Sequence, residues 1–410
     1  MRNRIVTPLF SFSVMIMVGC AQNAGTDKTA TKDSTAGAPV ETKEPNTKYP
    51  SAFPGQTRIA SVKTQTPFTE EKLAEGLGHP WAIIAYPGDR LLMTEKSGFL
   101  LLLDANGKVL NKIEGLPKVD DRGQGGLLDV ALDPDFAANK TIYWSYAEKK
   151  DTTNMLAVAK GQISADEKSV QNISVIFRAG PDMNSEYHYG SRLVFDKDGS
   201  LFVSSGERGI LEGRKRAQWL NAGMGKIFRI TKEGKAAEGN PFIGTKDAMP
   251  EIYSLGHRNP QGIALHPETG ELWELEFGPR GGDELNLIKP GKNYGWPIIT
   301  YGIEYSGEGI GDSIQQKDGM EQPVYYWDPV ISPSGITFYS GSGIAEWKNN
   351  LFISGLSSQH LARIVIENNK VVGEERLLES KKERLRDVTE LNGALYVVSD
   401  TGILFRIRKS

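Results

Sequence analysis

The chain has 410 residues, of which 39% are hydrophobic and 24% are charged, and its formal net charge is -3. This is ordinary globular composition, which excludes a disordered chain and an integral membrane protein. The small net charge gives no electrostatic basis for binding nucleic acid. The 45 glycines favour a fold with many turns over a helical bundle.

The first residues have the pattern of an export signal. Arg2 and Arg4 precede an apolar run at residues 5–18, which is too short to span a bilayer because about 20 residues are needed. The run ends at Cys20, the single cysteine of the chain, and the small residue before it resembles a bacterial lipobox. We expect residues 1–20 to be a lipoprotein signal peptide; the alternative is a plain signal peptide with an incidental cysteine.

Lipid on Cys20 would hold the protein on a membrane, at its periplasmic face or at the cell surface. Ala21 and Gln22 lack the aspartate that signals inner-membrane retention, which favours the outer membrane. Residues 21–50 have almost no large apolar side chains and cannot bury enough surface to offset chain entropy. The sequence therefore predicts a flexible linker over 21–50 and one folded domain over 51–410.

From Pro80 onward a unit recurs, in which two short apolar strands flank a turn rich in Pro, Asp or Gly. The strand pairs are expected at residues 82–85 and 91–93, 128–132 and 142–144, 193–195 and 201–203, 262–265 and 272–273, 336–338 and 351–353, and 387–388 and 395–397. More strand-like sequence follows each pair, and no long segment has helical periodicity. The sequence predicts an all-β fold, a six-bladed β-propeller of four-stranded antiparallel blades.

The segment before Pro80, including residues 58–62, is expected to supply the strand that closes the last blade. A domain of this size exceeds the usual limit for one core, but a propeller escapes that limit because each blade packs only on its neighbours. An array of β-sandwiches is the alternative architecture. Six units with similar turn chemistry favour the closed ring.

Polar residues gather in the loops between the strands, which meet at one end of a propeller's channel. Arg258 and Asn259 are adjacent and suit an anionic, carbonyl-bearing ligand, or form a polar loop tied by its own hydrogen bonds. His188 precedes a strand, where an imidazole serves as a general base or is structural. Gln124 lies in a glycine-flanked loop and is placed to orient a ligand.

Two further segments suggest charged ligands. Residues 276–288 and 293–297 combine closely spaced glycines with carboxylates, which suits calcium, although a tight turn with solvated acids explains the pattern equally well. Arg384 and Arg386 alternate into a strand, so both side chains point to one face. They need anionic company from neighbouring acids or a polycarboxylate ligand, unless they form an exposed edge pair.

These segments, in this order, resemble the soluble PQQ-dependent glucose and aldose sugar dehydrogenases over residues 78–405. The stretches that carry the resemblance are residues 123–136, the segment around His188, GHRNPQG at 256–262, GPRGGDELNLI at 278–288 with NYGWP at 293–297, and RLRDV at 384–388. The resemblance implies a six-bladed propeller with two cofactors, PQQ and calcium. Tyr187 and Ser357 depart from the glucose enzymes, which have aspartate and lysine there, and favour the aldose branch.

The resemblance also implies roles in cofactor binding. Arg384 and Arg386 would bind the carboxylates of PQQ, Arg258 and Asn259 would contact its carbonyl edge, and Asp400 would be a further cofactor contact. The backbone carbonyls of Gly278 and Pro279 would bind the calcium that polarises the quinone. Glu284 and the backbone of Tyr294 would form a second, structural calcium site.

In the implied reaction, His188 removes the proton of the sugar's anomeric hydroxyl while hydride passes from C1 to PQQ. Gln124 helps to position the reacting groups and contacts the cofactor, and Arg258 assists. The product is a lactone, and the electrons pass to an acceptor that the sequence does not name. Two other functions stay open, a calcium-dependent propeller lactonase and a cofactor-free carbohydrate-binding propeller.

Overall fold

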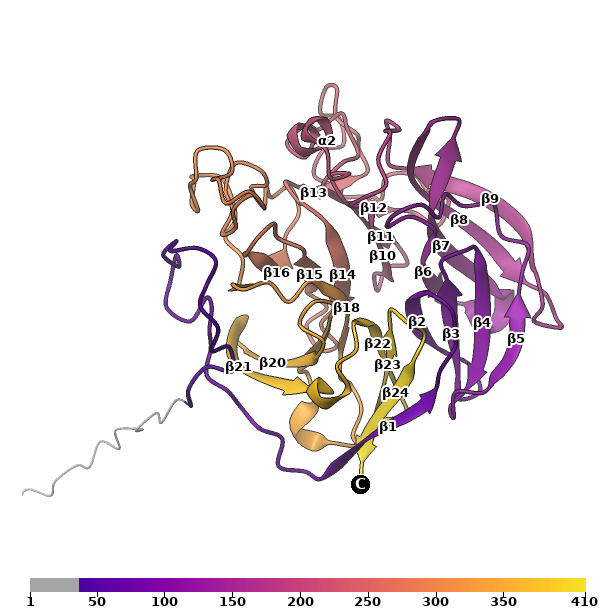
Figure 1. Ribbon diagram of the computed structural model, residues 1–410. Helices are drawn as coiled ribbons and strands as arrows, with labels where there is room; N and C mark the ends of the chain where they lie inside the picture. The colour runs from indigo at the N-terminus through magenta and orange to yellow at the C-terminus, as the bar shows by residue number, and fades with distance from the viewer. Residues whose placement is uncertain (1–36) are drawn as a thin grey trace, which may run out of the picture. The chain divides into compact units, whose positions relative to one another are not determined.

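The computed structural model describes residues 37–410, so the predictions for residues 1–20 and for the first part of the linker lie outside the described residues. The described chain forms six four-stranded antiparallel sheets arranged around a central channel (Figure 1). The predicted six-bladed β-propeller is therefore confirmed. Within residues 37–410, no helix has the length and apolar character needed to cross a membrane.

Each blade runs in chain order from an innermost strand beside the channel to an outermost strand at the rim, except at the closure. Blade 1 contains β2 (Pro80–Tyr86), β3 (Arg90–Glu95), β4 (Phe99–Asp104) and β5 (Val109–Ile113). Blade 2 contains β6 (Leu127–Leu132), β7 (Thr141–Lys150), β8 (Thr153–Ile163) and β9 (Val170–Arg178). Blade 3 contains β10 (Gly190–Phe195), β11 (Leu201–Ser205), β12 (Lys226–Ile230) and β13 (Ile252–Leu255).

Blade 4 contains β14 (Pro260–Leu265), β15 (Leu272–Glu276), β16 (Asp283–Ile288) and β17 (Tyr325–Trp327). Blade 5 contains β18 (Pro333–Phe338), β19 (Leu351–Gly355), β20 (Leu361–Glu367) and β21 (Lys370–Leu377). Blade 6 contains β22 (Leu385–Leu391), β23 (Ala394–Ser399), β24 (Leu404–Lys409) and β1 (Phe68–Ala74). The loops hold short helical segments, α1 (Phe136–Asn139), α2 (Leu211–Arg216), η1 (Ala345–Trp347) and η2 (Glu379–Lys381).

Blade 6 joins the two ends of the described chain through the segment before Pro80, as expected, but the closing strand is β1 and not residues 58–62. β1 pairs antiparallel with β24, from Phe68 opposite Lys409 onward. Residues 58–62, expected to close the ring, lie instead along blade 5, where Ser61 bridges Glu374. Ion pairs contribute to holding the closing strand: Glu71 lies 2.6 Å from Arg406 and 3.0 Å from Arg408.

The segment before β1 packs against the outside of blades 4 and 5. The backbone NH groups of Asn46 and Thr47 donate to the two carboxylate oxygens of Asp328, and Glu41 lies 2.8 Å from Arg376. Residues 37–50, which the sequence placed in the linker, therefore contact the propeller.

Apolar side chains from facing blades form the core, in clusters that join each blade to the next around the ring. Trp144, Trp273 and Trp347 are among the largest fully buried side chains, and each lies in a cluster between two blades. Burial of this kind contributes about 25 cal/mol per Å² of apolar surface, so the contacts between blades are the main source of stability.

All six innermost strands share an irregularity near their first residues. The register to the second strand shifts between Pro80 and Ile83, Leu127 and Val130, Gly190 and Leu193, Pro260 and Gly262, Pro333 and Ile336, and Leu385 and Asp387. A bulge bends the strand and re-aims a side chain. In this chain the bulges carry polar residues that the blades place around the channel.

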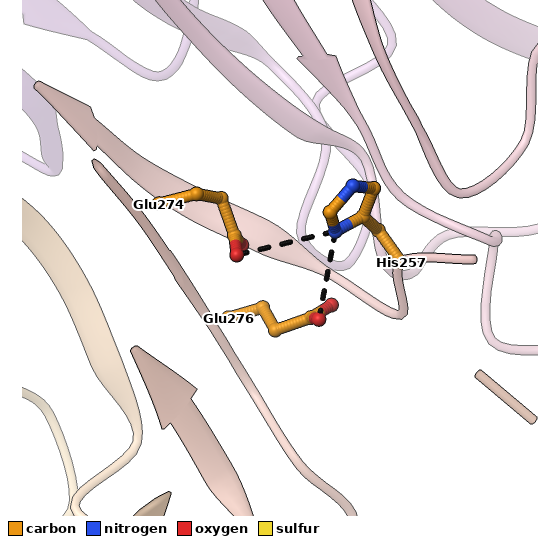
Figure 2. Close-up of side chains that lie close together, drawn as sticks. All are labelled: His257, Glu274 and Glu276. Carbon is orange, nitrogen blue, oxygen red and sulfur yellow. Dashed lines mark ion pairs between the residues drawn. The ribbon is translucent and has the colours of Figure 1, made fainter. Parts of the chain in front are cut away.

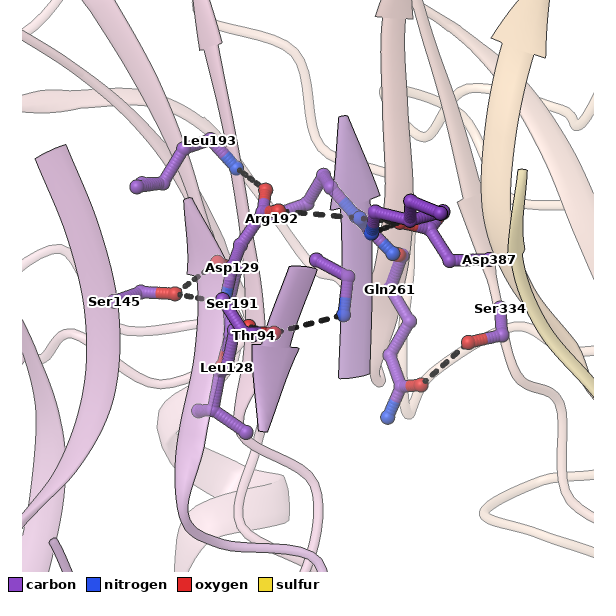
Figure 3. A network of polar contacts seen from close by, with 12 residues as sticks. Thr94, Leu128, Asp129, Ser145, Ser191, Arg192, Leu193, Gln261, Ser334 and Asp387 are labelled. Carbon is purple, nitrogen blue, oxygen red and sulfur yellow. Dashed lines mark hydrogen bonds and ion pairs between the residues drawn. The ribbon is translucent and has the colours of Figure 1, made fainter. Parts of the chain in front are cut away.

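Three of these residues, Asp129, Arg192 and Asp387, form a cluster that we call the hub (Figure 3). Arg192 Nη1 lies 3.2 Å from Asp129 and 3.1 Å from Asp387, and its Nε donates to the Gln261 carbonyl at 3.0 Å. The Arg192 side chain is only 7% exposed. Burial raises the pKa of Asp129 to about 6, against the charge of Arg192, so this carboxyl group stays ionised at pH 7.

The hub touches the innermost strand of every blade. Asp129, Arg192, Gln261 and Asp387 come from β6, β10, β14 and β22, and Asp387 also accepts from the backbone NH of Ile83 on β2 at 2.8 Å. On β18, a Cβ at Gly335 would lie 1.6 Å from Asp387, so only glycine fits there. The hub thus ties the six blades together at the centre.

We expect Arg192→Met to lower the free energy of unfolding by about 3–5 kcal/mol, because it leaves two buried aspartates without their cation. Urea unfolding followed by tryptophan fluorescence measures the loss. The matched control is Arg90→Met, which breaks the half-exposed ion pair with Glu167 and should cost about 1 kcal/mol or less. Equal losses in the two variants would contradict the central role of the hub.

Candidate active site

A cavity of about 660 Å³ lies at one end of the channel, within loops that precede or join the strands. Trp81 lines it, and the Arg192 guanidinium lies 4.4 Å from the centre of the Trp81 ring, so this ring connects the cavity to the hub. The cavity brings together every side chain predicted for catalysis or cofactor contact, namely Gln124, His188, Arg258, Asn259, Arg384, Arg386 and Asp400.

His188 occupies a fixed position before β10. Its backbone has φ +48°, an uncommon value for a residue with a side chain, and its NH donates to the Gln124 side-chain oxygen at 2.8 Å. Its ring Nδ1 lies 2.7 Å from a carboxylate oxygen of the buried Glu207. With Nδ1–H donating to Glu207, Nε2 is the nitrogen left to accept a proton.

The surroundings keep His188 neutral. Burial and the charge of Arg258 lower its pKa below the usual value, and the hydrogen bond to Glu207 opposes them without reversing the shift. A neutral imidazole at pH 7 with one free nitrogen is the form that a general base needs. The side chain keeps 16% of its surface exposed, which gives a substrate in the cavity access to it.

Arg258 and Asn259 lie just before β14, in the blade next to that of His188. The Asn259 side-chain oxygen accepts from the Gly190 NH at 3.0 Å, which fixes the chain beside His188 and leaves the amide NH₂ group to donate to a ligand. Arg258 Nη1 donates to the carbonyls of Phe277 at 2.9 Å and Gly278 at 2.7 Å. Arg258 therefore connects the histidine side of the cavity to the glycine-rich loop at residues 277–282, between β15 and β16.

Arg384 and Arg386 converge, as their alternation predicts, on one carboxylate. Arg384 lies 3.1 Å from one oxygen of Asp400, and Arg386 lies 2.6 Å from the other. Burial opposes ionisation of Asp400, but the charge and hydrogen bonds of Arg386, aided by Arg384, outweigh it and lower the pKa. The trio carries one net positive charge on the cavity wall, which favours an anionic ligand.

The glycine-rich loop after β15 places the four residues predicted for metal binding side by side. Gly278, Pro279, Glu284 and Tyr294 line a second, small cavity with room for about one water-sized particle. A Cβ at Gly278 would lie 2.2 Å from the Gly282 carbonyl, so the loop can close only with glycine there. Within residues 37–410 the Pro279 carbonyl accepts no hydrogen bond, which leaves it free for a cation.

Buried Asp283 holds this loop in place. Its two carboxylate oxygens accept from the backbone NH of Gly278 at 2.7 Å and from those of Ile331 and Ser332, both at 2.8 Å. The neighbouring Glu284 is also buried, and burial together with the charge of Glu276 raises its pKa well above the usual range. A bound cation would reverse that shift, because it would neutralise the carboxylate.

Sequence reasoning missed several residues of the site. Glu207 follows β11, at the same end of the blade as the loop that holds His188. Its place after a predicted strand is the one sequence feature that could have identified it as part of the site. Trp81 and Lys96 also line the cavity, and Lys96 donates to the Gly123 carbonyl at 2.7 Å. Neither a lone tryptophan nor a lone lysine has a spacing that distinguishes it from an ordinary core or surface residue.

Comparison with known proteins gives a consistent result. The family model for glucose / sorbosone dehydrogenases matches residues 77–406. The chain is 40% identical over 337 residues to the aldose sugar dehydrogenase YliI of Escherichia coli (strain K12). The aligned region covers 80% of this chain and 89% of that protein.

Solved structures give the same picture. The soluble aldose sugar dehydrogenase from Escherichia coli in the apo-form has a TM-score of 0.79 and 38% identity, covering 84% of this chain and 100% of that one. The PQQ-bound aldose sugar dehydrogenase from Streptomyces coelicolor has a TM-score of 0.69 and 28% identity, covering 84% and 99%.

We expect His188 to titrate below the usual histidine pKa in an NMR titration of the five histidines. Glu207→Gln should lower this pKa further, because the carboxylate stabilises the protonated ring. Glu186→Gln, which changes a more exposed glutamate near Arg122, is the matched control and should leave the titration in place. A His188 pKa that rises in Glu207→Gln would contradict the assigned contact.

Proposed function

The chain belongs to the glucose / sorbosone dehydrogenase family, and from this premise we propose that it oxidises aldose sugars at C1, with PQQ and calcium as cofactors. The observation that carries the proposal is a single cavity that joins a neutral histidine to a pair of arginines sharing one carboxylate. The histidine supplies a base and the arginines supply an anion site.

The cavity fits PQQ, a planar ortho-quinone with three carboxylates. Arg384 and Arg386 would bind carboxylates, and Arg258 and Asn259 would contact the carbonyl edge. Asp400 orders the two arginines, since its oxygens already accept from both. When bound, PQQ supplies the two-electron acceptor for the hydride that leaves the sugar.

The small cavity beside the glycine-rich loop fits one calcium ion as it stands, and two ions would require its walls to move apart. It offers the carbonyls of Gly278 and Pro279, the carboxylate of Glu284 and the backbone of Tyr294. Calcium prefers oxygen ligands of this kind. When bound near Gly278 and Pro279, it would act as a Lewis acid toward the quinone. A second ion at Glu284 and Tyr294 would be structural.

The protein's own residues handle the proton. His188 Nε2 accepts the proton of the anomeric hydroxyl, and Glu207 stabilises the imidazolium that forms. Gln124 holds the His188 backbone in place, so it positions the base. As the proton leaves the hydroxyl and hydride leaves C1, the C1–O bond becomes a carbonyl, and the product is the lactone. The two electrons then pass to an external acceptor.

The alternative of a calcium-dependent lactonase needs several carboxylates that converge on a metal in the channel. In the described residues, Asp400 is the one carboxylate among the cavity's lining residues, and it is paired with two arginines. This composition favours a bound polycarboxylate over a hydrolytic metal centre. A cofactor-free binding propeller would have no use for a neutral base beside Glu207.

We also propose that the protein is exported and anchored by lipid on Cys20, on the basis of the lipobox-like sequence alone. Cys20→Ser should move the protein from the membrane fraction to the soluble fraction after cell lysis. The matched control is Ser13→Ala, which changes the apolar run but keeps the cysteine and should leave the protein in the membrane fraction. Membrane association that survives Cys20→Ser would contradict the lipid anchor.

We expect dye reduction by the purified protein to require PQQ, calcium and an aldose together. His188→Gln should lower kcat by about 10²–10⁴, and the control His266→Gln, at a surface turn, should not. The rate of the native protein should rise with pH as His188 loses its proton and should be full by pH 7, since its pKa is below the usual value. No PQQ binding by absorbance and no turnover with any aldose would overturn the proposal.

A further inference from the structure

Blade 4 contains a second cluster of chemically active side chains, in the core behind the glycine-rich loop (Figure 2). Glu274 and Glu276 lie on one face of β15, directly opposite Asn286 and Glu284 on β16. The ring of His257, which precedes β14, faces the two carboxylates of β15. His257 and Glu274 are fully buried, and Glu276 is 3% exposed.

The cluster lacks partners for several polar atoms. His257 Nδ1 lies 3.6 Å from Glu276 and 3.9 Å from Glu274, which is too far for hydrogen bonds. In residues 37–410, His257 Nδ1, Glu274 Oε1 and Asn286 Oδ1 are all buried without a partner. Because buried polar groups are almost always satisfied, three such atoms in one place require an explanation.

The other contacts of these side chains hold them in position. His257 Nε2 lies 2.8 Å from the Ser254 hydroxyl, and the ring stacks on Tyr294 with centroids 4.8 Å apart. Glu276 accepts from the backbone NH of Arg258. The Asn286 amide donates to Glu274 at 3.0 Å. The unpartnered atoms therefore belong to fixed groups and not to side chains free to turn away.

Charge gives a second argument. Glu274, Glu276, Asp283 and Glu284 are four buried carboxyl groups in one blade. Arg258 can balance one of them, and the proposed calcium at Glu284 can balance two. Burial favours the protonated form of such carboxyl groups unless a cation lies among them, so a cation bound here would be stabilised by the carboxylates that it keeps ionised.

We propose that His257, Glu274 and Glu276 bind a divalent first-row transition ion such as Zn²⁺ or Mn²⁺, next to the small cavity proposed for calcium, whose wall includes Glu276. Their ligand atoms all lie within 4.8 Å of one another. Ligands about 2.1 Å from a tetrahedral ion are roughly 3.4 Å apart, so the present separations of 3.6 and 3.9 Å need to contract only slightly. Asn286 keeps its hydrogen bond to Glu274 and holds that carboxylate in place, and a water molecule would complete the tetrahedron.

The ligand set selects the metal. Calcium and magnesium prefer oxygen alone, whereas an imidazole nitrogen with two carboxylates suits zinc, manganese or iron. The ion's role is structural, because its ligands hold the backbone of Arg258 through Glu276 and stack on Tyr294 through His257. This inference stands on the core of blade 4 and does not depend on sugar oxidation.

The test begins with the metal content of the native full-length protein, measured by mass spectrometry after dialysis against a calcium-selective chelator. We expect about one transition ion per chain. His257→Gln and Glu274→Gln should each lose it. The matched control is Glu374→Gln, which changes an equally buried glutamate in blade 5 and should retain the ion.

A second measurement does not depend on the variants folding. The native protein is unfolded with chelator and refolded with Co²⁺, which should give visible absorption bands of a site with nitrogen and oxygen ligands. Zn²⁺ added during refolding should abolish these bands and raise the Tm. No ion in the native protein and no cobalt bands after refolding would overturn the proposal, as would ion contents in His257→Gln and Glu274→Gln equal to the native value.

Discussion

A single buried arginine, held between two aspartates, gives the propeller its common centre. Six blades that pack only on their neighbours define a ring but not the width of its channel. Arg192 sets that width, because its guanidinium reaches Asp129, Asp387 and the Gln261 carbonyl from three other blades. These bonds are directional and buried, so they couple the positions of the innermost strands. The shape of the cavity, whose wall includes Trp81 and Gln261, follows from this constraint.

The site, like the hub, pairs charged side chains with partners that hold them in position. Glu207 orients His188 through a hydrogen bond, and Asp400 holds two arginines while neutralising only one of their two charges. The result is a base kept neutral at one place and a net positive charge at another, inside one cavity. Most of these residues lie in the loops directly before or after the strands, such as His188 before β10 and Asp400 after β23, where the blades bring them to one end of the channel.

The architecture was predictable because its signals are local. Each blade repeats apolar strands around turns of Pro, Asp or Gly, and these can be recognised without knowing what lies opposite. The segment that closes the ring was predicted, but its exact strand was not, because the charged residues of that strand, such as Glu71, are explained only by Arg406 and Arg408 at the other end of the chain. The hub escaped prediction for the same reason: Asp129, Arg192 and Asp387 are far apart in sequence, and only ring closure brings them together. In the cavity, the loop residues with distinctive neighbours, such as Arg258 and Asn259, were found, whereas the isolated Glu207 was not.

The closure of blade 6 has a consequence for how the protein is made. Glu71 on β1 is synthesised early, yet its partner Arg406 follows 335 residues later. Until then β1 has no partner strand, and the ring stays open during translation. Contacts between residues so distant in sequence form slowly, because a long loop must close first. A nascent chain therefore cannot close its ring until its last strand is made, which is compatible with the proposed export of the chain before folding.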